Sequence, residues 1–406
     1  MARTVAELPA GSRITDYISL GVIAKFFPVE KVHAALRQTG RESIRERDLP
    51  AHVVMYYVIA LALYMRSSYR EVLRCLLEGV QWLLDPSATV KVAGKSGISQ
   101  ARSRLGVEPV KALYEAVVTP IAEQRTRGAW YRRWRVTSLD GSTLDVADTA
   151  ENEAAFGRPG ASRGASAFPK IRFVTLLENG THVLWAAQMD QYAVDEITLA
   201  ERVVPALRKG MLCLADRFFP GYKLWSLAAK TGADLLWRAR QNARLDVDKK
   251  LADGSYLSRI YASTSDRRNQ RKGIVVRVVD YELKDVPGAE PIYRLITTIL
   301  DPAQAPAKEL AALYHERWEI ETALDELKTH LRGAQMVLRS KKPELVQQEF
   351  YGLLMAHFAI RGLMHEAALK ADEDPDRLSF LHAVRIVQRR MARYGAIPPS
   401  AQENPA

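Results

Sequence analysis

The order of strands and helices predicted between residues 135 and 240 limits the chain to few folds. Strands are expected where β-branched and apolar residues run together, at 135–148, 171–178, 181–188, 211–216 and 234–240. Helices are expected at about 194–207 and 221–231. The Asn179-Gly180 pair is a typical hairpin turn, so the first three strands are predicted to form an antiparallel meander. The predicted order is therefore strand, strand, strand, helix, strand, helix, strand.

This order is that of a ribonuclease-H-like α/β core, a mixed sheet flanked by helices, in which catalytic carboxylates gather near the ends of the first and fourth strands. Asp140 follows the apolar Leu139 in the first strand, where a buried strand normally avoids a charge, and Asp216 ends the fourth. The segment 151–170 between the first two strands is rich in glycine, serine and arginine, and we expect it to be a mobile loop.

The remaining sequence predicts further domains around this core. Residues 1–128 are predicted to form a helical N-terminal DNA-binding domain, and 241–300 a β-rich insertion that divides the core into 129–240 and 301–372. Residues 373–406 are expected to form a C-terminal helix and tail. The longest apolar run, 53–65, is too short to span a bilayer and is predicted to be a buried helix.

The charge balance favours a polyanionic partner. The chain has 58 lysines and arginines against 47 acidic residues, a formal net charge of +11, which indicates nucleic acid before other partners. The two cysteines, Cys75 and Cys213, have no disulfide-framework or metal-site spacing, which favours a reducing, intracellular setting. The first residues lack the apolar core of a signal peptide, so no membrane partner is expected.

Three basic segments each allow two interpretations. The segment 95–106 carries Arg102 and Arg104 and is either a helix presented to DNA, as in helix-turn-helix proteins, or an ordinary surface helix. The segment 124–135 interleaves arginines with Trp130, Tyr131 and Trp134, and is either a basic DNA-contacting junction or a packed linker. The arginines of the last helix either contact DNA or face water, and we favour water.

The segment 314–331 contains five carboxylates, which helical periodicity separates. At about 100° per residue, Tyr314, Arg317, Glu321 and Lys328 share one narrow stripe beside the apolar seam. The same rule predicts that three other acids project to the far side and are solvated, namely Glu316, Glu319 and Glu326. Asp325 is the one rival that lies near the stripe. Glu321 is thus either part of a surface ion-pair network or a metal ligand with cationic neighbours.

The aspartates of the predicted core favour the metal interpretation. Asp140, Asp216 and Glu321 would repel one another unless they bound divalent cations, and Mg²⁺, with Mn²⁺ as an alternative, suits a set of oxygen ligands. Two such ions about 4 Å apart can activate a water or a 3′-hydroxyl and stabilise the leaving oxygen in phosphodiester displacement. Asp145 and Asp148 are weaker candidates, since structural turns would explain both.

With these residues in place, the chain resembles the DDE transposases of bacterial insertion sequences of the IS-four type. The family signature Y-x2-R-x3-E-x6-K is complete as Tyr314, Arg317, Glu321 and Lys328. The segments SLDGSTLDVADT and CLADRFFPGYKLW are similar to the blocks that carry the first and second aspartates. The match extends over nearly the whole chain.

The resemblance implies a catalytic triad of Asp140, Asp216 and Glu321 that also holds the metal. It further implies that the other signature residues contact DNA phosphates near the cleaved end. The predicted DNA contacts outside the triad are Tyr314, Arg317, Lys328, Arg217, Tyr293, Arg102 and Arg104. Tyr293 occupies the place where some relatives hold a flipped base during hairpin formation, although a core tyrosine explains it equally well. Trp237 is expected to be a core residue.

The main hypothesis is a cut-and-paste transposase. It would bind terminal inverted repeats, cleave the ends by metal-dependent hydrolysis, with or without a hairpin intermediate, and join the 3′-hydroxyls to target DNA by transesterification. Pairing of two ends implies a homodimer on DNA. Two alternatives remain: a metal-dependent nuclease of the same fold without strand transfer, and a DNA-binding regulator that has lost its chemistry.

Overall fold

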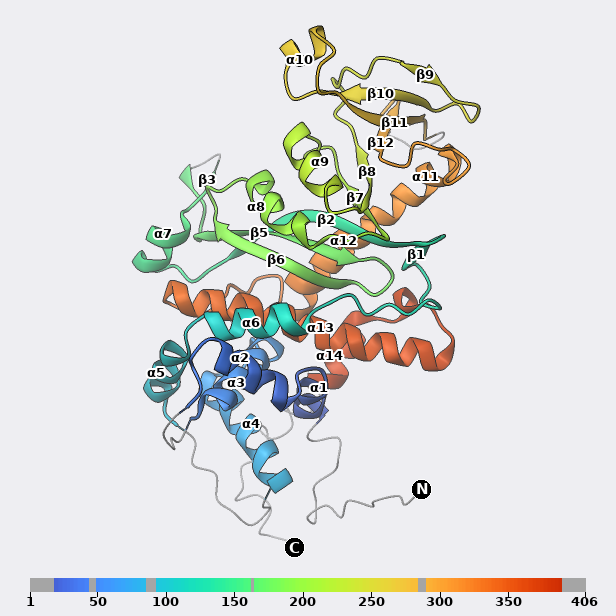
Figure 1. The fold of residues 1–406 in the computed structure, drawn as a ribbon. Coiled ribbons are helices and arrows are strands. Elements are labelled where there is room, and N and C mark those ends of the chain that lie inside the picture. Colours follow the sequence, from blue (N-terminus) through green and yellow to red (C-terminus); the bar gives the residue numbers. More distant parts are fainter. Residues whose placement is uncertain (1–17, 44–48, 85–92, 162–163, 284–289, 389–406) are drawn as a thin grey trace, which may run out of the picture.

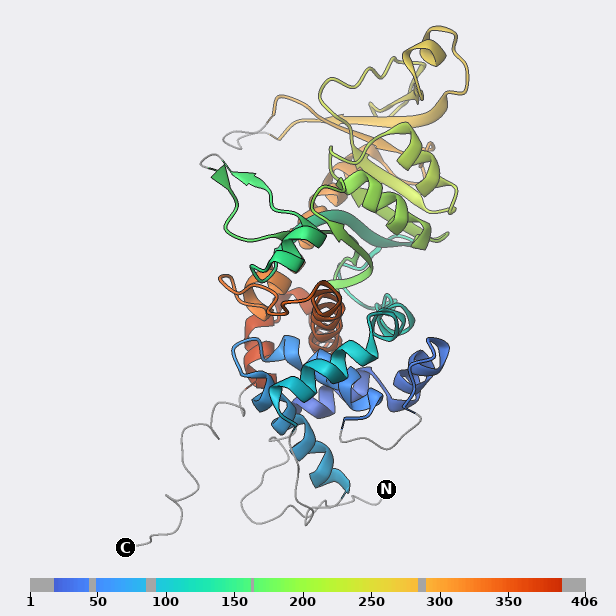
Figure 2. The ribbon, with the colours of Figure 1, turned by 90° about the vertical axis from the view of Figure 1, so that its left-hand side faces the viewer.

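The structure of the protein is a computed structural model, and it describes all residues except 1–17, 44–48, 85–92, 162–163, 284–289 and 389–406. The described chain forms a helical region, a central mixed sheet and a β-rich region stacked along one long axis (Figures 1 and 2). None of the helices within the described ranges combines the length and the apolar character needed to cross a membrane.

The first part of the chain is helical, as predicted. Its helices are α1 (Ile18–Phe26), α2 (Val29–Gln38), α3 (Ala51–Leu63), α4 (Tyr69–Leu84), α5 (Lys95–Leu105) and α6 (Glu108–Val117). The apolar run that forms α3 is buried over most of its length, because it packs against the long C-terminal helix α13 (Pro343–Ala371). At their crossing a β-carbon added to Gly352 would lie 2.7 Å from the carbonyl oxygen of Val58, so a glycine is required for this close approach.

The five predicted core strands are present, and the ribonuclease-H-like core is confirmed. They are β2 (Trp134–Asp145), β5 (Lys170–Glu178), β6 (Val183–Gln191), β7 (Met211–Ala215) and β8 (Asp234–Arg238). Their order in the sheet is β6-β5-β2-β7-β8, with β5 antiparallel to both β2 and β6 and with β7 parallel to β2 and β8. Helices α8 (Glu196–Val203) and α9 (Tyr222–Ala229) provide the crossovers that parallel strands require.

The segment 151–170 is not the loop that its composition predicts. It contains helix α7 (Ala150–Phe156) and a small hairpin of β3 (Gly160–Ala161) and β4 (Gly164–Ala165). The side chain of Thr149 accepts a hydrogen bond from the backbone N–H of Asn152, and this cap stabilises the start of α7. The amide of buried Asn152 then donates to two backbone carbonyls, which fixes the helix to the core.

The β-rich insertion extends the central sheet instead of forming a sheet of its own. It consists of β9 (Lys249–Lys250), β10 (Tyr256–Ile260), helix α10 (Thr264–Arg268), β11 (Ile274–Tyr281) and β12 (Tyr293–Thr297). Strand β12 pairs antiparallel with β8, and β11, β10 and β9 follow in order. The short strand β1 (Trp130–Tyr131) pairs antiparallel with the first residues of β2.

The C-terminal helices do not form a separate unit. Helix α13 contacts β6 on one side and α3 and α6 on the other, and α14 (Phe380–Gln388) packs on α13 and α1. The predicted division between 301–372 and 373–406 therefore falls inside one packed helical layer (Figure 1). Of the arginines predicted to face water in the last helix, Arg385 is exposed, and the others lie outside the described residues.

Candidate active site

Asp140 and Asp216 lie side by side at the sheet. Leu139 of β2 pairs with Ala215 of β7 in parallel register, and the two aspartates are the next residues on these strands. Adjacent strands are about 4.8 Å apart, so the register brings the two carboxylates to one place. Strand β7 ends at Ala215, and the carboxylate of Asp216 accepts a hydrogen bond from the N–H of Phe218 at 2.7 Å. The predicted meeting of the first and fourth strands is therefore observed.

The surroundings of Asp140 disfavour its charge. Burial is the main reason that the pKa of Asp140 is raised to about 7, and the neighbouring charge of Asp216 acts in the same direction. A hydrogen bond from the N–H of Gly141, at 2.8 Å, opposes these effects only in part. A cation at this place would favour the charged carboxylate.

The segment that carries the five carboxylates is helical but not uniform. It begins after α11 (Ala307–Leu313) with a 3-10 turn (Tyr314–Arg317), continues as α12 (Trp318–Asp325) and ends as a π-helix (Glu326–Leu331). We call 314–331 the motif helix. It lies against β2, on the side of the sheet away from α8 and α9 (Figures 1 and 2).

Alternate residues of β2 contact successive positions of the motif helix. Side chains two apart on a strand share a face, and here Ser138, Asp140 and Ser142 face the helix. Ser138 donates to Asn179, whose amide donates to the carbonyl of Glu316. The guanidinium of Arg317 lies 3.8 Å from Asp140, and Lys328 donates to the hydroxyl of Ser142 at 2.9 Å.

Arg317 connects the two parts of the site. Its guanidinium is buried and lies between the carboxylate of Asp140 and that of Glu321, to which it donates at 3.0 Å. The side chain of Glu321 is 44% exposed, so it faces solvent on the sheet side of the motif helix. Asp325 accepts a hydrogen bond from Thr329 on its own helix at 2.5 Å.

Two of the far-side acids are not solvated, so that prediction is wrong for Glu319 and Glu326. Glu326 is buried and receives hydrogen bonds from Arg361 and His357 of α13. Glu319 is nearly buried and accepts the backbone N–H of Gly180. Their side of the motif helix meets α13 and the turn between β5 and β6 instead of water. Glu316, the third acid of this group, is exposed as expected.

The buried acids belong to an ion-pair network. Within the described part of the chain, His182, Glu319 and Asp376 form the one group whose possible metal-ligand atoms all lie within 4.8 Å of one another. However, Nδ1 of His182 contacts the guanidinium of Arg361, which can only donate. Nδ1 is then the acceptor and Nε2 carries the proton, and it is Nε2 that faces Asp376 at 3.1 Å. We therefore assign this group to the buried polar network around Glu326 and not to metal binding.

Two family models match the chain. The model described as insertion element 4 transposase N-terminal matches residues 17–115, and the one described as transposase DDE domain matches 133–359, more than half of the chain. The chain belongs to the IS4-type DDE transposases. It is therefore an enzyme that cleaves DNA and transfers its strands, and DNA is its partner.

Curated relatives agree with the family models. The transposase InsG for insertion sequence element IS4, from Escherichia coli strain K12, is 28% identical over 390 residues, which cover 93% of this chain and 84% of InsG. The putative transposase InsZ of the same organism is 22% identical over 220 residues, or 54% and 71% of the two chains. A solved piggyBac transposase synaptic complex with hairpin DNA is similar over 94% of this chain and 83% of its own, at 12% identity and with a TM-score of 0.45.

The donor set of this DDE transposase suits a divalent metal ion, which the family implies. Asp140, Asp216 and Glu321 offer only carboxylate oxygens, the ligands that hard cations prefer. Burial, with the neighbouring charge of Asp216 as a smaller contribution, raises the pKa of Asp140, and a bound cation would favour its charged form. Asp145 and Asp148, the weaker candidates, form ion pairs with Lys170 and Arg158 and are explained as structural residues.

The predicted DNA contacts of the transposase differ in their accessibility. Arg217 is exposed and pairs with Glu290, which also binds Arg238. Tyr293 is half-buried, with its ring stacked on Tyr281 and covered by the guanidinium of Arg238 at 4.5 Å. Trp237 is fully buried, as expected of a core residue.

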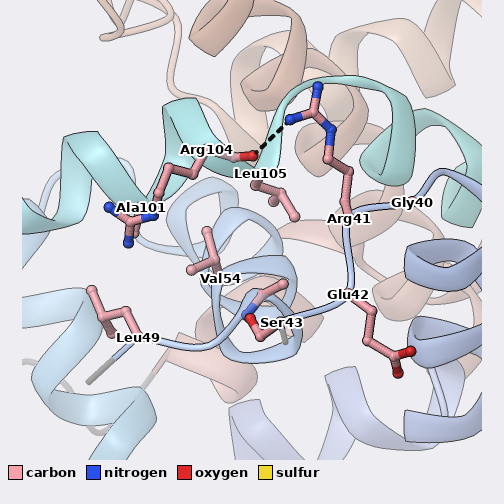
Figure 3. Close-up of a pocket in the computed structure, with 10 residues that line it drawn as sticks. Gly40, Arg41, Glu42, Ser43, Leu49, Val54, Ala101, Arg104 and Leu105 are labelled. Carbon is pink, nitrogen blue, oxygen red and sulfur yellow. Dashed lines mark hydrogen bonds between the residues drawn. The ribbon is translucent and has the colours of Figure 1, made fainter. Parts of the chain in front are cut away.

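Arg102 is not placed to bind DNA. Its side chain is 2% exposed, and its guanidinium donates to groups that α13 and the preceding segment supply, namely Gln348, Ser340 and Leu345. We therefore correct its predicted role to that of a residue that fixes α5 to α13. Arg104, two residues on, is exposed at the rim of a cavity of about 490 Å³ (Figure 3). Its carbonyl accepts a hydrogen bond from Arg41 across that rim.

The basic junction at 124–135 is a packed linker. Four of its five arginines pair with acids, namely Arg125 with Glu123, Arg127 with Asp372 and Glu373, Arg132 with Glu309, and Arg135 with Glu178. The fifth, Arg133, donates to the side-chain oxygen of Gln304. Its aromatic rings are also engaged, since Tyr131 stacks on Trp134 and Arg135 covers Trp130. The packed interpretation therefore accounts for this segment.

Two side chains beside the site were not predicted from the sequence. Trp318 is 57% exposed next to Arg317, whose guanidinium lies 5.0 Å from its ring, although a tryptophan in an amphipathic helix is expected in the core. Glu196 begins α8 and lies against Gly141. Acids are common in the first turn of a helix, so its position in the sequence gave no signal.

Proposed function

We propose that this transposase binds the terminal inverted repeats of its element and hydrolyses DNA at the element ends, using Mg²⁺ held by Asp140, Asp216 and Glu321. The freed 3′-hydroxyls then attack target DNA by transesterification. The observation that carries the proposal is the parallel pairing that places Asp140 beside Asp216, opposite the helix that presents Arg317 and Glu321.

The metal ions would activate the attacking oxygen and stabilise the leaving oxygen of the phosphodiester. The surrounding side chains supply binding and orientation. Arg317 and Lys328 place positive charge beside the carboxylates, where a phosphate of the DNA end can accept hydrogen bonds from them. Tyr314 is buried, and its hydroxyl donates a hydrogen bond to the carbonyl of Ala215, the residue before Asp216. We therefore assign Tyr314 the role of holding Asp216 in position.

The pairing of two element ends requires two active sites, so we propose that the transposase acts on DNA as a homodimer. We propose that cleavage proceeds without a hairpin intermediate. The ring of Tyr293 already contacts Tyr281 and Arg238, and a flipped base would have to displace one of them. Arg217 and Arg104 remain proposed DNA contacts because both are exposed.

The test uses labelled duplexes that carry the inverted repeats flanking the coding region, together with a target plasmid and Mg²⁺. We expect cleavage at the element end, followed by labelled DNA covalently joined to the plasmid. Cleavage without joined product would show a nuclease of the same fold, and end binding without cleavage would show a regulator. The variant Glu321→Ala serves as the control for contaminating nucleases.

A further inference from the structure

Glu196 is a fourth carboxylate at the proposed active site. It is the first residue of α8, and the preceding Asp195 caps this helix by accepting the backbone N–H of Thr198 at 2.8 Å. The cap fixes the start of the helix, and with it the direction in which Glu196 leaves the backbone. Helix α8 packs on β5 and β6, so Glu196 approaches the site from the face of the sheet opposite to the motif helix.

The backbone of β2 leaves room for this carboxylate. Gly141 lies between Asp140 and Ser142, both of which face the motif helix, so a side chain at 141 would point toward α8. A β-carbon added to Gly141 would lie 2.8 Å from Cδ and 3.1 Å from Oε2 of Glu196. The backbone of Gly141 is not in the left-handed region, so here glycine provides space, not an unusual conformation.

The partners of Glu196 do not neutralise it fully. In the part of the chain that the structure describes, its one ion pair is with Arg172, at 3.9 Å between Nε and Oε1. The guanidinium of Arg172 also donates to the carbonyl of Val194 and covers the ring of Tyr192. On the other side Glu196 experiences the negative charges of Asp216 and Asp140.

An ordinary glutamate at a helix start explains only part of this arrangement. The helix dipole and Arg172 account for an acid in the first turn. They do not account for its position against the one residue of β2 that lacks a side chain, directly after Asp140. An unconstrained glutamate with a 37% exposed side chain would turn toward water instead of toward two other carboxylates.

We infer that Glu196 contributes its carboxylate to the divalent-cation site of Asp140 and Asp216, and that Gly141 is required so that it can reach this site. The inference rests on the proposed function, because it adds a residue to the metal site proposed there. It predicts that the affinity for the metal ion depends on Asp140, which faces the motif helix, and also on Glu196, which lies on the opposite face of β2.

The experiment measures Mn²⁺ binding to the full-length protein by water-proton relaxation. The variants are Glu196→Gln, which keeps the shape and removes the charge, and Gly141→Ala. The matched control is Glu201→Gln on the same helix, where Glu201 pairs with Lys223 at 2.6 Å. We expect Glu196→Gln and Gly141→Ala each to weaken Mn²⁺ binding by about tenfold or more, and Glu201→Gln to leave it unchanged.

A double variant shows whether Gly141 acts through Glu196. In the Glu196→Ala background the added methyl group has no carboxylate to displace, so Gly141→Ala should cause no further loss. If the double variant instead loses affinity for Mn²⁺ by the product of the two single losses, Gly141→Ala disturbs Asp140 directly. That result would contradict the proposed role of the glycine. Thermal unfolding of each variant establishes that it is folded.

The outcomes separate this inference from the proposed function. If Glu196→Gln binds Mn²⁺ like the control while Asp216→Asn does not, Glu196 is not part of the site and the triad stands. If Asp216→Asn also binds like the wild type, or the wild type has no saturable site, the metal site itself is wrong. Weaker Mn²⁺ binding by both Glu196→Gln and Asp216→Asn supports the inference.

Discussion

Tyr314 shows what a single signature residue does in this fold. Its ring is buried, and its hydroxyl donates to the carbonyl of Ala215 at 3.2 Å, one residue before Asp216. Burial is the main reason that the pKa of Tyr314 is raised, so the hydroxyl remains a neutral donor at physiological pH. The resemblance implies a phosphate contact for this residue, whereas the structure shows the hydroxyl engaged with the sheet.

The variant Tyr314→Phe distinguishes these roles. We expect it to lower the free energy of unfolding by about 1 kcal/mol, because it removes one buried hydrogen bond. We also expect slower end cleavage with unchanged affinity for the DNA end. Tyr56→Phe is the matched control, since its hydroxyl also donates to a carbonyl, that of Phe27, but in the helical region. Weaker DNA binding with unchanged stability would show that the hydroxyl reaches a phosphate.

At the residue scale, the sequence predicted which side chains meet but not always what they do. Apolar strand residues before Asp140 and Asp216 indicated that both carboxylates lie at the sheet, and the structure agrees. Arg102 could not be assigned, because an arginine on a short helix is usually exposed and its partners on and near α13 are more than 230 positions away along the chain.

At the element scale, the motif helix is held on both sides. The sheet side carries the stripe of Tyr314, Arg317, Glu321 and Lys328, and three of these contact β2, β7 or their ends. On the opposite side, Glu326 is buried against α13. Burial alone would raise the pKa of Glu326, but its contacts with His182 and His357 and the charge of Arg361 outweigh it, and its pKa is lowered.

The variant Glu326→Gln tests this second attachment. Removing one partner of a buried ion pair leaves Arg361 uncompensated, so we expect a loss of about 3 kcal/mol in the free energy of unfolding at pH 7. A lowered pKa in the folded protein stabilises it fully above the usual glutamate pKa of 4.5, and this contribution is lost as the pH falls further.

The measurement is urea unfolding at pH 7 and at pH 4, with the exposed Asp325→Asn as the control. The difference between wild type and Glu326→Gln should be largest at pH 7 and smaller at pH 4. An equal difference at both values would show that Glu326 carries no buried charge in the folded protein.

Helical periodicity predicted the stripe of the motif helix but not its opposite face. The periodicity places residues around a helix axis without stating what covers each side, so acids away from the seam were expected to meet water. The prediction of a loop at 151–170 was wrong for a related reason. Its glycines and serines indicate a loop, but the capping hydrogen bond of Thr149 and the contacts of Asn152 stabilise a short helix there.

At the scale of the whole molecule, the long helix α13 joins the helical region to the sheet. It contacts α3 and α6 on one side and β6 on the other, and Gly352 and Gly362 allow close approach to Val58 and Phe26. The order of the core strands could be predicted, because crossover connections restrict how successive elements are arranged. The helices that pack against α13 could not be predicted, because the apolar pattern of a helix does not specify which distant helix covers it.

This architecture places the proposed active site where the sheet and the motif helix meet. The sheet supplies Asp140 and Asp216, the motif helix supplies Glu321, and α13 fixes the back of the motif helix through Glu326. We propose that these three carboxylates, and not the other acids of the motif helix, perform the chemistry of this transposase.

The most direct test is cleavage of labelled element ends by Asp140→Asn, Asp216→Asn and Glu321→Gln, with end binding measured on the same samples. Asp325→Asn is the matched control from the same helix. We predict that each triad variant cleaves at least about a thousandfold more slowly while binding the ends like the wild type, and that Asp325→Asn cleaves normally. The account would be contradicted if Glu321→Gln cleaved like the wild type, or if Asp325→Asn were the variant that lost cleavage while the triad variants kept it.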